Sequence, residues 1–262
     1  MTDRRHADLR SAAFFDLDRT LMAGSSGFFW ARAAFESGVI SRRRLAVDGW
    51  QNVRFRLSGS TDAGTDAVRA RVCAMIEGHE EKEFARLAPR VLAGVLPRIY
   101  PQMLDVAYGH QDAGRDVYIA TAASQGLAEL LAHVLAFDGG LGSKYELDAD
   151  GVYTGREDGP FCYREGKAQR VQELAMAEGI DLSASYAYSD SESDLPLLRA
   201  VGHPVAVNPD VPLAKVAAQE GWEVLRFEQL GRKLKAGAAV GAAALVGTAG
   251  ASAARSGRRG AR

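Results

Sequence analysis

The sequence predicts an α/β fold in which a doubly wound parallel sheet is built from strands that alternate with helices. Short apolar runs typical of buried parallel strands support this fold, at residues 12–17, 116–121, 185–188 and 204–207. Segments with helical character lie between or after these runs, at residues 125–136, 164–178 and 194–200. Because strands and helices alternate, we expect the strands to run parallel, with helices connecting them.

Residues 27–96 break this alternation and are expected to form a helical cap inserted after the first strand. Four amphipathic helices are predicted there, at residues 28–37, 41–57, 65–77 and 80–92. Insertions at the ligand end of a parallel sheet commonly act as lids that exclude water. The core domain is accordingly predicted at residues 11–26 and 97–230. Within it, residues 145–154 are expected to form a hairpin with Asp150-Gly151 in the turn.

Composition limits the function classes. The chain has 262 residues, of which 47% are hydrophobic and 25% charged, as in ordinary soluble globular proteins. A formal net charge of -1 argues against a dedicated nucleic-acid binder. Cys73 and Cys162 lie far apart and form no metal-ligand spacing. Two reduced thiols are therefore expected, and the cytoplasm is the predicted location.

The last segment, residues 231–262, is rich in Ala and Gly and ends in several arginines. No charge occurs in residues 236–254, a stretch close to the length that spans a bilayer, but few of its side chains are strongly apolar. We interpret it as a flexible tail or, alternatively, as a weak membrane anchor. The sequence does not indicate an oligomeric state.

Asp16 and Asp18 end the first predicted strand and, two residues apart on an extended segment, point the same way. One carboxylate can attack a phosphoryl group, while the other protonates the leaving oxygen and then activates water. A cation must offset the repulsion between the anionic nucleophile and the phosphate, and Mg²⁺ suits a site of few carboxylates. The alternative is an acidic pair that caps a strand or turn.

Two further positions could bind the phosphoryl oxygens. Thr121 ends a predicted strand just before a helix, so its hydroxyl and the following amides, including that of Ala122, could bind an anion. Thr121 could equally be a plain N-cap residue. Lys167 opens a predicted helix and could neutralise both Asp16 and the phosphate, or it could be a solvated helix lysine.

The segment Ser189-Asp190-Ser191-Glu192-Ser193-Asp194 follows the third predicted strand. Asp190 could complete a metal site, and Asp194, four residues later, could support the metal ligands or Lys167. An acidic cluster at a helix N-terminus is the alternative. Since ligands gather at the carboxyl ends of parallel strands, Asp16, Thr121 and Asp190 are expected to converge.

In this order, the motifs resemble those of the haloacid dehalogenase-like hydrolase superfamily. Its first motif, Asp-x-Asp-x-Thr, is matched by Asp16-Leu17-Asp18-Arg19-Thr20, its second by Thr121, its third by Lys167 and its fourth by Asp190 and Asp194. The chain looks most like the phosphoserine phosphatase-like branch, subfamily IB. The resemblance implies a Rossmann-like core with a helical C1 cap, Asp16 as nucleophile, and Asp18 as general acid and base. It also implies Mg²⁺ held by Asp16, the Asp18 backbone carbonyl and Asp190.

The resemblance therefore predicts a magnesium-dependent phosphatase that hydrolyses a small phosphorylated metabolite through a phospho-aspartate. Two departures do not support phosphoserine as the substrate. Residues 22–27 lack the glutamate that phosphoserine phosphatases carry after the first motif, and Thr121-Ala122-Ala123 replaces Ser-Gly-Gly. Two alternatives remain: a phosphotransferase or mutase of the same superfamily, and a non-catalytic phospholigand-binding protein.

Overall fold

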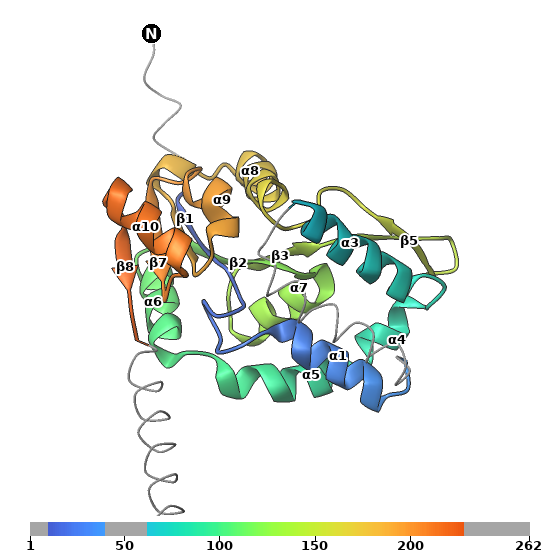
Figure 1. Cartoon of the computed structure of the whole chain (residues 1–262). Coiled ribbons are helices and arrows are strands. Elements are labelled where there is room, and N and C mark those ends of the chain that lie inside the picture. Colours follow the sequence, from blue (N-terminus) through green and yellow to red (C-terminus); the bar gives the residue numbers. More distant parts are fainter. Residues whose placement is uncertain (1–9, 40–61, 228–262) are drawn as a thin grey trace, which may run out of the picture. The chain divides into compact units, whose positions relative to one another are not determined.

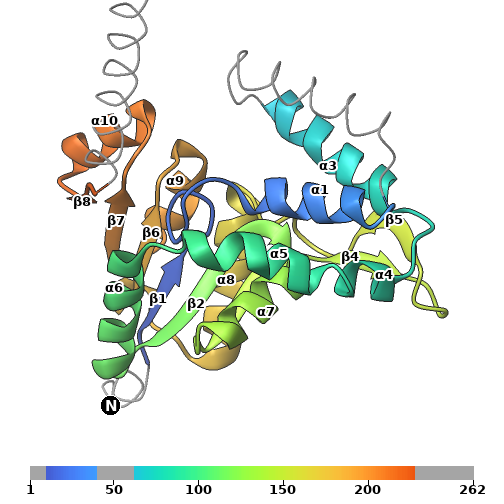
Figure 2. The ribbon, with the colours of Figure 1, turned by 90° about the horizontal axis from the view of Figure 1, so that it is seen from below.

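The central strand of the sheet is β1 (Ala12–Phe15), and all four of its residues are buried. The computed structural model describes residues 10–39 and 62–227. β1 pairs in parallel with β2 (Asp116–Ser124) on one side (Figure 1) and with β6 (Tyr186–Ser189) on the other (Figure 2). The outer strands complete the order β3-β2-β1-β6-β7-β8, with bounds Gly139–Ser143 for β3, His203–Val207 for β7 and Glu223–Leu225 for β8. The predicted parallel α/β sheet is confirmed.

All four predicted strands are present, whereas β3 and β8 were not predicted. β3 has the sequence Gly-Gly-Leu-Gly-Ser, which lacks the apolar run of a buried strand. Its glycines are needed because α7 (Gln125–Val134) packs directly on it. A Cβ at Gly140 would lie 2.3 Å from the carbonyl carbon of Ala128, and one at Gly142 would lie 2.7 Å from the Gln125 nitrogen. Close helix packing thus takes the place of side-chain hydrophobicity in this strand.

Helices cover both faces of the sheet. On one face, Phe14 stacks on Tyr118 and belongs to a core that includes buried residues of three helices. These are α8 (Glu165–Glu178), α9 (Leu195–Leu198) and α10 (Val211–Glu220). On the opposite face, Phe15 stacks on Tyr188 at 4.4 Å and meets His110 of α6 (Pro101–Asp112) edge-on. This alternation of buried side chains makes the sheet doubly wound.

Four helices of the segment after β1 are described. They are α1 (Ser26–Glu36), α3 (Asp62–Ile76), α4 (Glu81–Ala85) and α5 (Ala88–Val95), the last followed by a 3-10 turn at Leu96–Arg98. The single helix predicted at residues 80–92 is wrong, because two helices occupy that stretch and Leu87 separates them. Pro89 lacks the amide hydrogen that would continue the first helix, and it suits the first turn of the second. The predicted helix at 41–57 lies outside the described residues.

The chain leaves and re-enters the sheet domain at one place. Ala23 N donates to Arg98 O at 2.8 Å, and Tyr100 N donates to Leu21 O at the same distance. The two connections to the helical segment therefore run antiparallel to each other. Such a pair of adjacent crossings is the arrangement expected for a segment inserted into a loop.

The predicted hairpin is confirmed as β4 (Tyr145–Leu147) and β5 (Tyr153–Glu157), with Gly151 in the turn at a φ of 76°. The packing of this hairpin against the inserted helices was not predicted. Arg69 Nε of α3 donates to Glu157 at 2.9 Å, and Glu81 N donates to Gly151 O at 3.0 Å. The hairpin thus lies beside α3 and α4, which are distant from it in sequence (Figure 2).

In residues 10–39 and 62–227, no helix has the length and apolarity required to cross a bilayer. Residues 225–262 form a separate unit, most of which, including the whole predicted tail at 231–262, lies outside the described part of the chain.

Candidate active site

The polar residues predicted to converge do line one pocket. Asp16 follows β1 and Asp190 follows β6, so both stand at the carboxyl ends of adjacent parallel strands. They border a pocket of about 460 Å³. The other sequence-predicted site residues also line it: Asp18, Thr121, Ala122, Lys167 and Asp194. The topology of a parallel sheet explains the convergence, since strand ends meet at one edge.

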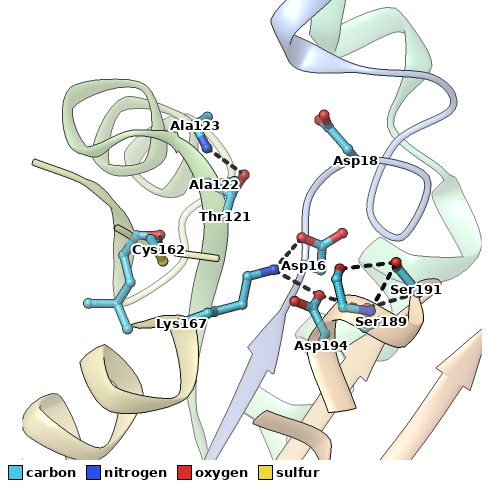
Figure 3. A network of polar contacts seen from close by, with 12 residues as sticks. Asp16, Asp18, Thr121, Ala122, Ala123, Cys162, Lys167, Ser189, Ser191 and Asp194 are labelled. Atoms are coloured by element: carbon cyan, nitrogen blue, oxygen red, sulfur yellow. Dashed lines mark hydrogen bonds and ion pairs between the residues drawn. The ribbon is translucent and has the colours of Figure 1, made fainter. Parts of the chain in front are cut away.

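Lys167 lies between two buried carboxylates at the floor of this pocket (Figure 3). Its Nζ donates to Asp16 Oδ1 and to Asp194 Oδ2, each at 2.8 Å, and the lysine is only 2% exposed. Burial alone would lower the pKa of Lys167, but Asp16 and Asp194 outweigh it and raise that pKa. The solvated-lysine interpretation is therefore wrong, and Lys167 is a fixed positive charge in the first turn of α8.

Asp194 is held from a second side by a residue that the sequence did not point to. Ser189 Oγ, at the end of β6, donates to Asp194 Oδ2 at 2.7 Å and accepts from Ser191 N at 3.2 Å. Asp194 makes no side-chain capping bond at the start of α9, so the capping interpretation is wrong for it. Asp194 instead holds Lys167, which is one of the two supporting roles that the sequence predicted for it.

Asp190 is a buried carboxylate with little compensation. Burial raises its pKa to about 8, repulsion from Asp16 adds to the rise, and Arg19 opposes it. Arg19 Nη2 lies 3.1 Å from Asp190 Oδ2, but that oxygen accepts no hydrogen bond. Arg19 itself has a φ of 67°, an unusual conformation for a residue with a side chain. Arg19 lines the same pocket as Asp16 and Asp18.

Asp16 has similar electrostatics. Burial raises its pKa, Lys167 lowers it, and the neighbouring carboxylates of Asp194 and Asp18 raise it again. Four carboxyl groups thus share the pocket with two cationic side chains, those of Lys167 and Arg19.

Asp18 is oriented by the first residues of α1. Ser25 Oγ donates to its Oδ2 and Ser26 N donates to its Oδ1, both at 2.8 Å. The capping alternative is therefore partly right for Asp18, because its carboxylate bonds to an amide at the helix start. The same two bonds fix its carboxylate at the pocket wall, beside Asp16 (Figure 3). The sequence motif identified Asp18 but not the serines that hold it.

Thr121 is buried in β2, which continues to Ser124, and the N-cap of α7 is Ser124. The N-cap interpretation of Thr121 is therefore wrong. Its Oγ1 accepts from Ala123 N at 3.2 Å, and the pairing of β2 with β3 shifts register between Ala120 and Ser124. The irregular backbone turns Thr121, Ala122 and Ala123 toward the pocket, which they all line.

The residues present fit a divalent cation. Oδ2 of Asp190 is buried and accepts no hydrogen bond, and the carboxylates of Asp16 and Asp190 repel each other. No group of three or more His, Cys, Asp and Glu side chains suited to metal binding occurs in the described residues. A cation here would therefore take two carboxylates, with backbone, water or substrate oxygens as further ligands. Mg²⁺ prefers that kind of donor set.

Comparison with known proteins agrees with this arrangement. The family model of haloacid dehalogenase-like hydrolases matches residues 13–199. A Mycobacterium tuberculosis protein named phosphoserine phosphatase is 35% identical over 254 residues, covering 96% of this chain and 82% of its own length. A Neisseria meningitidis protein named histidinol-phosphatase is 30% identical, covering 84% of this chain and all of its own. A solved structure of a Bordetella pertussis protein of unknown function is 31% identical, with a TM-score of 0.72, over 83% of this chain and 98% of that one.

Proposed function

Since the chain belongs to the haloacid dehalogenase-like hydrolase family, we propose that it is a phosphatase that hydrolyses small phosphate monoesters, with Asp16 as nucleophile. The observation that carries this proposal is the position of Lys167, which lies 2.8 Å from Asp16 while Asp194 holds it from the other side. A carboxylate at the carboxyl end of a central strand, beside a buried cation, is placed to attack an anionic phosphoryl group.

In the first step, a carboxylate oxygen of Asp16 forms a bond to phosphorus while the bond between phosphorus and the alcohol oxygen breaks. Asp18 gives its proton to that leaving oxygen, so the alcohol departs neutral. The phosphoryl group is then carried by Asp16 as an acyl phosphate. Lys167, Thr121 and the amide of Ala122 bind the phosphoryl oxygens.

In the second step, Asp18 takes a proton from water as the water oxygen bonds to phosphorus. The bond between phosphorus and Asp16 breaks, which releases inorganic phosphate and restores the carboxylate of Asp16. Asp18 again holds a proton for the next turnover. Ser25 can serve both states of Asp18, because a hydroxyl can donate to a carboxylate or accept from a protonated carboxyl group.

We further propose that Mg²⁺ is the cofactor, held by the side chains of Asp16 and Asp190 and by the backbone carbonyl of Asp18. When bound, it would supply positive charge that offsets the repulsion between the substrate phosphate and the carboxylates. Oδ2 of Asp190 is buried and accepts no hydrogen bond, although Arg19 Nη2 lies 3.1 Å away, and this supports the assignment. The helical segment 27–96 is proposed as the cap, with residues 11–26 and 97–230 as the core; the adjacent crossings near Ala23 and Arg98 support that division.

The test is phosphate release from an aryl phosphate in the presence and absence of Mg²⁺. We expect magnesium-dependent turnover by the wild type and none above background by Asp16→Asn, which keeps the size of the side chain. Asp112→Asn, at the exposed end of α6, is the matched control and should turn over normally. Equal phosphate release by the wild type and Asp16→Asn would overturn the mechanism. Addition of an alcohol as competing acceptor distinguishes hydrolysis from phosphoryl transfer in the same assay.

A further inference from the structure

Charge is unevenly distributed in the active-site pocket. Six described residues in its lining are charged. Five of them follow the ends of β1 and β6, and the sixth, Lys167, is in the first turn of α8; the six are Asp16, Asp18, Arg19, Lys167, Asp190 and Asp194. The described lining residues from α1, α3, α4 and the hairpin carry no charged group. The part of the pocket that would receive the alcohol portion of a phosphate monoester is therefore uncharged in the described residues.

Aromatic rings form a continuous wall in this uncharged part. Trp30 of α1 stacks on Phe84 of α4 at 5.4 Å, with an angle of 21° between the ring planes. Phe84 contacts Tyr153 of the hairpin at 5.6 Å, and Tyr153 contacts Tyr145 edge-on at 6.4 Å. All four residues line the pocket and are only partly buried. We call these four residues the aromatic wall.

Apolar side chains of α3 and α7 extend the same surface. Met75, Ile76 and Leu127 also line the pocket. Three separate segments of the chain, α1, α3–α4 and β4–β5, thus bring apolar groups to the pocket that also holds the carboxylates. Stretches that are distant from one another in sequence thus contribute side chains to the pocket that holds the proposed phosphate site. A purely structural core would not require this arrangement.

We propose that the natural substrate is a phosphate monoester of an uncharged, largely apolar or aromatic alcohol, a proposal that rests on the proposed function. The aromatic wall binds the alcohol portion by burying its apolar surface. Each methylene group that it buries is expected to raise kcat/KM roughly fourfold. An amino alcohol or amino acid ester would instead lose the hydration of its charged groups and find no oppositely charged partner among the described wall residues.

The rival is recognition of a cationic alcohol by the ring faces, since aromatic groups also bind ammonium ions. The geometry favours the uncharged substrate, because Trp30 and Phe84 stack on each other and so cover one face of each ring. The described wall also offers no carboxylate to an ammonium group. Neutral and cationic substrates of the same shape distinguish these two possibilities.

The experiment measures kcat/KM of the full chain with Mg²⁺ for two pairs of substrates matched in shape. n-Propyl phosphate is compared with phosphoethanolamine, and 3,3-dimethylbutyl phosphate with phosphocholine; phosphoserine is included. We expect the neutral member of each pair to be preferred by about tenfold or more. We also expect kcat/KM to rise along the series from n-propyl to n-hexyl phosphate.

Equal or better turnover of the charged members, with no rise along the alkyl series, would overturn the substrate class and leave the proposed function intact. Absence of turnover with every monoester, the aryl phosphate included, would overturn the proposed function and this inference together. The two failures are therefore distinguishable in one set of assays.

Variants test whether the aromatic wall causes the preference for longer alkyl chains. Phe84→Ala should reduce the ratio of kcat/KM for n-hexyl over n-propyl phosphate by about tenfold, because truncation removes much of the apolar surface that the longer chain contacts. Phe84→Leu, which keeps a large apolar side chain at this position, should reduce the ratio less. Phe28→Ala is the control, since Phe28 lies on α1 near Trp30 but is 63% exposed and outside the pocket. An unchanged ratio in Phe84→Ala, or an equal fall in Phe28→Ala, would contradict the assignment.

Discussion

Replacing Lys167 with methionine should destabilise the protein strongly, and more so at high pH than at low pH. Lys167 Nζ lies 2.8 Å from carboxylate oxygens of both Asp16 and Asp194, and all three residues are buried. At an effective dielectric constant of about 20, each such contact is an attraction of about 6 kcal/mol. Loss of hydration offsets much of that attraction in the native protein, but the variant would retain the two buried carboxylates without their cation.

Truncating one member of a buried ion pair typically costs about 3–5 kcal/mol of unfolding free energy, and the loss of two contacts here places the expectation near the upper end. The variant can lessen this cost by taking up a proton. Burial already raises the pKa of Asp16, and removal of Lys167 removes the main influence that lowers it. A folded state with the raised pKa binds more protons than the unfolded chain, so its stability falls as pH rises.

The assay is urea unfolding followed by circular dichroism at about pH 5.5 and about pH 8, for the wild type and Lys167→Met. The matched control is Lys215→Met, which removes an exposed lysine from α10 and should change stability by less than about 0.5 kcal/mol. A loss below about 1 kcal/mol in Lys167→Met, or a larger loss at the lower pH, would refute the reasoning.

Three further outcomes are expected. Ser25→Ala should lower kcat about tenfold with little change in KM, because it removes the 2.8 Å hydrogen bond that orients Asp18 but none of the groups proposed to bind the phosphoryl oxygens. Asp190→Asn should raise the Mg²⁺ concentration needed for half-maximal thermal stabilisation about tenfold or more, since the proposed ligand loses its charge. The stability that His110 contributes should fall as pH falls from about 6.5 toward 4, because burial and Arg115 lower the pKa of His110 to about 4, so the unfolded chain binds a proton that the folded state excludes.

Each of these three predictions can be contradicted by a specific result. An unchanged kcat in Ser25→Ala would show that the hydrogen bond from Ser25 does not orient Asp18 for catalysis. Equal magnesium stabilisation of the wild type and Asp190→Asn would remove Asp190 from the proposed metal site. The unfolding free energy of the wild type relative to His110→Gln should therefore fall over that pH range, whereas His133→Gln, on the exposed face of α7, should follow the wild type; the opposite result would assign the proton to another group.

The parts of the fold that the sequence predicted are those with a strong local signal. β1, β2, β6 and β7 are continuous apolar runs that end in polar residues, which is the pattern of buried parallel strands. β3 gave no such signal, because its burial depends on α7 approaching Gly140 and Gly142. That requirement is a tertiary contact, and no local pattern of hydrophobicity expresses it.

The same distinction holds for the candidate site. Strand order and direction were enough to predict that Asp16, Thr121 and Asp190 lie together at the carboxyl ends of the strands. The positioning of Asp18 by Ser25 depends on where α1 begins, and the packing of Tyr153 on Phe84 depends on a hairpin that lies beside helices distant in sequence. The proposed catalytic residues were therefore predictable from motif and strand order, whereas the residues that orient them or shape the pocket required the structure.

The most direct test of the account is to trap the phosphorylated nucleophile. The full-length protein is quenched with acid during turnover of an aryl phosphate with Mg²⁺, treated with borohydride to reduce any acyl phosphate, and digested for peptide mass spectrometry. We expect the reduced side chain at position 16, and no such product in Asp16→Asn. A phosphoryl group on another residue, or continued turnover by Asp16→Asn, would contradict the assignment of Asp16 as the nucleophile.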